Sequence, residues 1–134
     1  MKPTNFNKAR WHYCQIVTAL VCDDAINAGI IAEHHVTPLL FFFILAWKND
    51  RIHRWLAPKE PEEIKENNLM MLINYMYEKG NVFECNRSTI ANLLIRMDVL
   101  NDISKYKTIM NNFSKTMPKV IQREAHSIFL EICK

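Results

Sequence analysis

Glycine is scarce in this sequence, whose 134 residues include only Gly29 and Gly80. Phosphate-cradling loops, nucleophile elbows and tight β-turns depend on backbone conformations that glycine adopts at little cost. A chain with so few glycines is therefore a poor candidate for a nucleotide-binding or β-rich fold. The scarcity instead favours helices that are joined by short connections.

The sequence also lacks the spacings that paired metal ligands show. Its four cysteines (Cys14, Cys22, Cys85 and Cys133) form no C-x-x-C pair, and no two histidines or cysteines stand three or four residues apart. Zinc sites on helices usually have such pairs. We therefore expect no metal and no other cofactor, and we interpret the cysteines as buried free thiols of a cytosolic protein.

A hydrophobic run long enough to cross a membrane is missing as well. The most apolar stretch, "VTPLLFFFILAW" at 36–47, has twelve residues, whereas a spanning helix needs about twenty. Lys48, Asp50 and Arg51 follow directly and would lie in hydrocarbon. The N-terminal residues "MKPTNFNKARWHYC" contain no apolar core of the kind that signal peptides have. We expect a core helix, no membrane partner and a cytoplasmic location.

No set of side chains suggests catalysis. Asp23 and Asp24 are adjacent, and neighbouring residues on a helix do not face each other. Both stand near the C-terminal end of an expected helix at 8–28, where negative charge is mildly unfavourable. Nucleophilic catalysis needs a base beside the nucleophile, and no such pair is evident. We expect a protein that is not an enzyme.

What the sequence does contain is helical periodicity. Apolar residues recur at spacings of three and four through most of the chain, whereas no long stretch alternates with period two. The predicted helices are 8–28, 36–57, 62–79, 86–97, 102–117 and 118–132. We predict an all-α protein, a single compact bundle of five to six helices over residues 1–134. The proline-containing linker 57–61 is a candidate division between a hydrophobic helical hairpin (1–57) and a helix-turn-helix-like bundle (62–134).

Three of these helices carry more specific expectations. The helix at 8–28 has a second apolar face with Trp11 and Cys14, so we expect it to be central. Pro61 is expected to open the helix at 62–79, because proline is tolerated in the first turn. In the helix at 102–117, apolar residues from Ile103 to Met117 form a seam that faces either the protein's own core or a second copy in a homodimer.

The C-terminal quarter of the chain carries the basic excess. Residues 102–134 contain six basic and three acidic residues, and this difference of three equals the net charge of +3. The helices at 86–97 and 102–117 have the order of a helix-turn-helix unit, although Ile95 stands where its turn glycine is expected. In that arrangement Ser104, Asn111 and Asn112 face nucleic acid together with basic residues. The predicted nucleic-acid-binding residues are Lys105, Lys107, Asn111, Lys115 and Lys119.

A second surface is predicted at the end of the helix at 36–57. There Trp47, Arg51 and Arg54 place an exposed tryptophan among arginines, a combination that is typical of interaction hot spots. Our leading hypothesis is a nucleic-acid-associated regulator or a basic subunit of a nucleoprotein assembly. The alternative is a protein-binding inhibitor or immunity-type factor. The abundance of Ile, Asn and Lys hints at an AT-rich source such as a phage or a mobile element.

Overall fold

The computed structural model describes residues 6–101, 103 and 105–133. This part of the chain is all-α, as predicted, and its β-type pairings are isolated bridges, between Ile31 and Phe83 and between Lys59 and Glu63. None of the helices described is long and apolar enough to span a membrane.

The helices follow one another with short connections. The first half contains α1 (Lys8–Val21), α2 (Asp23–Asn27), a 3-10 turn (Glu33–His35), α3 (Val36–Lys48) and α4 (Asp50–Leu56). The second half contains α5 (Glu66–Tyr75), a π-helical turn (Met76–Gly80), α6 (Arg87–Arg96), α7 (Tyr106–Phe113) and α8 (Lys119–Ile132). The predicted helices are thus present, but two of them are broken and several are shorter than expected.

The break in the predicted helix 8–28 lies at Cys22, whose ψ of 170° is extended. A new helix, α2, begins at the next residue. Asp23 and Asp24 therefore occupy the first turn of a helix, where negative charge is favourable, and not the C-terminal end as expected. Gly29, with φ +73°, follows α2 in the left-handed conformation that glycine adopts easily.

The break in the predicted helix 36–57 lies at Asn49, whose ψ is 123°. Its side-chain oxygen accepts hydrogen bonds from the backbone N–H groups of Arg51 and Ile52, at 3.1 and 3.0 Å, and so caps α4. The expectation for Pro61 is wrong, because it precedes α5 by several residues and α5 begins at Glu66.

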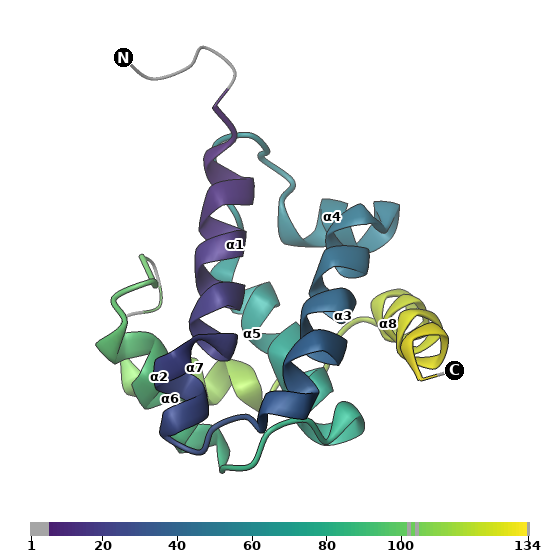
Figure 1. The fold of residues 1–134 in the computed structure, drawn as a ribbon. Helices are drawn as coiled ribbons and strands as arrows, with labels where there is room; N and C mark the ends of the chain where they lie inside the picture. The colour runs from purple at the N-terminus through teal and green to yellow at the C-terminus, as the bar shows by residue number, and fades with distance from the viewer. Residues whose placement is uncertain (1–5, 102, 104, 134) are drawn as a thin grey trace.

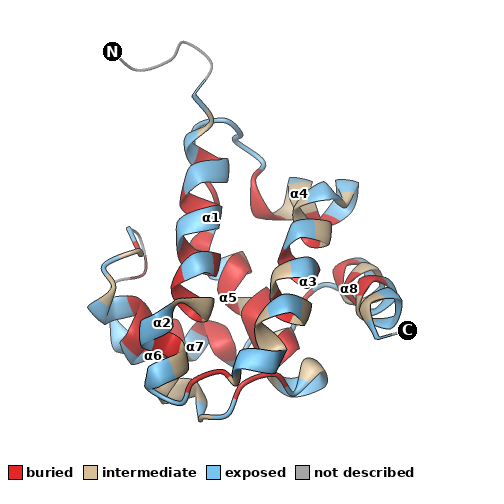
Figure 2. Ribbon diagram, in the orientation of Figure 1, coloured by how far each residue is buried: buried red, intermediate tan, exposed pale blue. Residues whose placement is uncertain are grey.

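The helices pack around one core (Figure 1). α1 and α3 run side by side, α4 lies across one end of α3, and α8 packs against both α3 and α4. α5 packs on α7, and α6 contacts both α1 and α7. In Figure 2 the buried residues gather where α1, α3 and α5 meet. Hydrophobic residues from both sides of the linker 57–61 belong to this core.

Burial corrects two expectations and bears on a third. α1 is not central, because Trp11 is 58% exposed and Cys14 is also exposed. Cys133 is exposed too, whereas Cys22 and Cys85 are half-buried, so the cysteines are free but not the buried thiols that we expected. In the predicted seam, Ile103 and Met117 are buried in the protein's own core. Phe113 is buried there too, whereas Tyr106 is 43% exposed, so most of the seam faces this core.

Candidate functional site

The predicted basic residues lie on α7 and on the segments directly before and after it. Lys107 and Asn111 are one helical turn apart on α7, and both are exposed. Lys105 directly precedes α7, Lys115 follows it, and Lys119 begins α8, and all three are exposed as well. Among the described residues, none of these four lysines forms an ion pair. The structure therefore places all five predicted residues on or beside one helix, in contact with solvent.

The inner side of α7 fixes this orientation. Ile109 and Phe113 are buried in the core, whereas Lys107 and Asn111 are exposed. Asn112 does not face outward as we expected, because it is only 2% exposed. Its Nδ2 donates to the Asn67 side-chain oxygen at 2.9 Å and to the Thr108 carbonyl oxygen at 3.0 Å. Asn112 thus joins α7 to α5, and Ser104 lies outside the described residues.

The connection 97–105 leads into α7 and is held by a buried carboxylate. Glu66, which is 2% exposed, accepts hydrogen bonds from the backbone N–H groups of Asn101, at 2.7 Å, and Ile103, at 3.0 Å. His12 Nε2 lies 2.8 Å from Glu66 Oε2 and 2.8 Å from the Val99 carbonyl oxygen. This connection is much longer than the three- or four-residue turn of a helix-turn-helix unit, so that expectation is wrong in its geometry.

Trp47 is not the exposed tryptophan that we expected. It is half-buried at the end of α3, where its ring lies 4.7 Å from the Tyr13 ring and 4.3 Å from the His53 ring. His53 Nδ1 lies 2.9 Å from the Trp47 carbonyl oxygen, and His53 Nε2 lies 2.6 Å from Glu60 Oε2. These contacts make Trp47 part of the packing between α1, α3 and α4.

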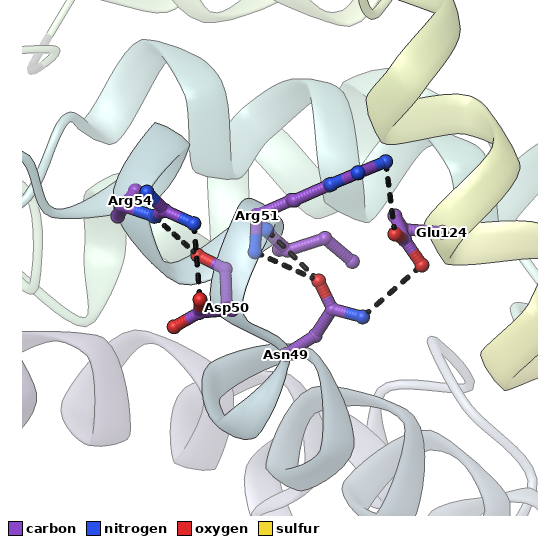
Figure 3. A network of polar contacts seen from close by, with 6 residues as sticks. Asn49, Asp50, Arg51, Arg54 and Glu124 are labelled. Carbon is purple, nitrogen blue, oxygen red and sulfur yellow. Dashed lines mark hydrogen bonds and ion pairs between the residues drawn. The ribbon is translucent and has the colours of Figure 1, made fainter.

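Arg51 and Arg54 are exposed, and each forms an ion pair with a carboxylate (Figure 3). Arg54 binds Asp50 Oδ2 at 3.0 Å within α4. Arg51 forms an ion pair with Glu124 of α8 at 3.6 Å. The same carboxylate accepts a hydrogen bond from Asn49 Nδ2 at 3.3 Å. The side chains are 61% exposed for Arg51 and 71% for Arg54. Both guanidinium groups therefore remain accessible to a partner while they help to hold α4.

A groove that the sequence did not reveal runs along α1. It has a volume of about 330 Å³ and lies between α1 and the end of α6. Its lining is Trp11, Cys14, Gln15, Thr18, Ala19, Cys22, Met97 and Val99. The second apolar face of residues 8–28 was the available signal, but we interpreted it as a sign of a central helix. In the described part of the chain, no three His, Cys, Asp or Glu side chains gather as a metal site.

Comparison with known proteins adds no assignment. The chain matches no protein-family model, no curated protein and no solved structure.

Proposed function

We propose that this protein is a non-catalytic binding protein that contacts nucleic-acid phosphates through Lys105, Lys107, Lys115 and Lys119. The observation that carries the proposal is the charge of the segment around α7. Residues 103–123 contain five basic residues and no acidic residue. The predicted lysines are exposed and, within the described residues, free of ion pairs. Exposed cations without an internal ion pair attract phosphate without first losing an internal partner.

The dimensions of this surface suit a polynucleotide strand. The eight residues of α7 extend for about 12 Å at a helical rise of ~1.5 Å per residue, and Lys105 and Lys115 lie just beyond its two ends. Successive phosphates of one strand advance by ~3.4 Å along a duplex, so the surface is about as long as four nucleotides. Asn111 lies between the lysines and is exposed, and its side-chain amide can both donate to and accept from a base edge.

The test is the salt dependence of binding. Fluorescence anisotropy with duplex DNA, single-stranded DNA and RNA should show binding that weakens steeply as salt rises. The double variant Lys105→Ala/Lys107→Ala should lower the slope of log K against log salt by about 2 on duplex DNA, because each lost phosphate contact contributes ~0.9.

The matched control is Arg51→Ala/Arg54→Ala, which removes the same charge from α4. It should leave the salt slope unchanged. Equal losses in the two double variants would show that overall charge, and not the α7 surface, governs binding. No binding to any of the three nucleic acids at low salt would refute the proposal.

A second candidate function is binding to a protein, as an inhibitor or immunity-type factor, through the α3–α4 segment. It is favoured by the accessible guanidinium groups of Arg51 and Arg54 and by the exposed apolar side chains of Phe41 and Ile44 on α3. Aromatic and arginine side chains together are typical of interface hot spots. Capture from a nuclease-treated lysate that is lost in Arg51→Ala/Arg54→Ala, but kept in Lys105→Ala/Lys107→Ala, would support this candidate over the first.

A further inference from the structure

The groove along α1 is apolar and uncharged. Its polar members are Gln15 and Thr18, and the other lining side chains are apolar or thiols. Trp11 stands at one end of it, 58% exposed, with its ring 6.4 Å from that of Phe6. A tryptophan exposed to this degree beside an apolar groove leaves a large hydrophobic area in water, which a partner surface would cover.

We propose that this groove is a self-association surface, in which α1 of one copy packs antiparallel against α1 of a second copy. Several side chains of α1 that line the groove are small enough for a second helix to approach closely. Cys14 and Thr18 are spaced four residues apart and so lie on one side of the helix, and Cys22, which directly follows α1, also lines the groove. They are smaller than Trp11, and two such helices approach closely where small side chains meet.

The positions on α1 set the register of this pairing. A two-fold axis between residues 16 and 17 places Trp11 of one copy over Cys22 of the other, and Gln15 over Thr18. Each tryptophan then lies at the end of the groove where the partner's side chains are small. The contact is made twice, once on each side of the axis, as a two-fold interface requires.

The charges at the two ends of α1 favour pairing with a second copy in the antiparallel orientation. Lys8 and Arg10 stand at the N-terminal end of α1, whereas Asp23 and Asp24 stand just beyond its C-terminal end. All four are exposed, and among the described residues none of them forms an ion pair. The proposed axis brings the basic pair of one copy opposite the acidic pair of the other. A parallel pairing would instead place like charges together.

Reversal of these charges provides the test. The variants Lys8→Glu/Arg10→Glu and Asp23→Lys/Asp24→Lys each place like charges together at both ends of the dimer. Each should therefore raise the dimer dissociation constant by about tenfold or more, as measured by analytical ultracentrifugation. An equimolar mixture of the two variants restores opposite charges at both ends and should dimerise as well as the unmodified protein.

This recovery on mixing separates an interface from a folding defect, because damaged folds are not repaired by mixing. Circular dichroism on each variant checks that the helices are retained. A mixture that associates no better than its two components would overturn the antiparallel register. If analytical ultracentrifugation of the unmodified protein at millimolar concentration gives the mass of a single chain, the proposal is overturned entirely.

A second comparison tests the groove itself. Trp11→Ala should weaken self-association by at least tenfold, because tryptophans that become buried in an interface are frequent hot spots. Leu130→Ala is the control, since Leu130 on α8 is 53% exposed and lies outside the groove. Equal effects of the two variants would contradict the assignment. The lysines of the α7 surface do not take part, so this inference stands independently of the proposed function.

Discussion

At the scale of single residues, burial decides what a side chain does. The Tyr13 hydroxyl is buried between α1 and α3 and donates a hydrogen bond of 2.6 Å to the Phe43 carbonyl oxygen. Burial, with a smaller contribution from nearby Cys14, raises the pKa of Tyr13 well above its ordinary value. Tyr13, Ile16 and Leu20 recur at helical spacing, which favours one buried face. The partner of the Tyr13 hydroxyl, however, lies thirty residues away and depends on how α3 packs.

This environment predicts how stability depends on alkaline pH. Above the ordinary tyrosine pKa of about 10 the unfolded chain loses the Tyr13 proton, whereas the folded chain keeps it. The free energy of unfolding therefore falls as pH rises above about 10. Tyr13→Phe should reduce this decline, and at pH 7 should cost about 1 kcal/mol for the lost hydrogen bond.

Urea denaturation at pH 7 and at pH 10.5 measures both effects. Tyr106→Phe is the control, because Tyr106 is exposed. An alkaline decline that is equal in Tyr13→Phe and the unmodified protein would contradict the role of Tyr13.

At the scale of elements, the sequence predicted most of the helical segments but not where the helices begin, end or break. The periodicity through residues 36–57 is continuous, yet α3 ends at Lys48 and α4 begins at Asp50. The break depends on Asn49, whose amide caps α4 and also donates to Glu124 on α8. A contact across seventy-five residues of sequence leaves no trace in local periodicity, so this break could not be predicted.

The double role of Asn49 predicts a graded loss of stability. Asn49→Ala removes both the cap and the link to α8, and should lower the free energy of unfolding by about 1–2 kcal/mol. Asn49→Asp keeps a capping oxygen but places a second carboxylate near Glu124, so it should fall between Ala and the unmodified protein. Chemical denaturation measures the order. Equal stability of the alanine variant and the unmodified protein would refute this role for Asn49.

At the scale of the whole molecule, buried polar contacts join distant segments. Glu66 on α5 links His12 of α1 to the backbone of the connection 97–105. The all-α class and the exposure of the α7 lysines could be predicted, because they follow from glycine scarcity and amphipathic spacing. The burial of Asn112 and Trp47 and the exposure of Trp11 could not, because each is decided by which neighbouring helix covers the side chain.

Removal of the Glu66 carboxylate should therefore affect more than one element. Glu66→Gln replaces an acceptor oxygen by a donor group that faces backbone N–H groups, and should cost about 3 kcal/mol of unfolding free energy. Hydrogen exchange at the amides of Asn101 and Ile103 should also accelerate. Glu62→Gln is the control, because Glu62 is exposed. Unchanged exchange at both amides in Glu66→Gln would contradict the anchoring role.

The connection 97–105 has a further consequence, because its two ends belong to different surfaces. Met97 and Val99 line the groove on α1, whereas Lys105 stands at the start of the basic α7 surface. One connection, whose Asn101 and Ile103 amides donate to Glu66, thus borders both proposed contacts. If occupancy of the groove changes the affinity of the lysines for phosphate, thermodynamic reciprocity requires nucleic acid to change self-association by the same factor. The dissociation constant of the dimer would then report whether nucleic acid occupies the basic α7 surface.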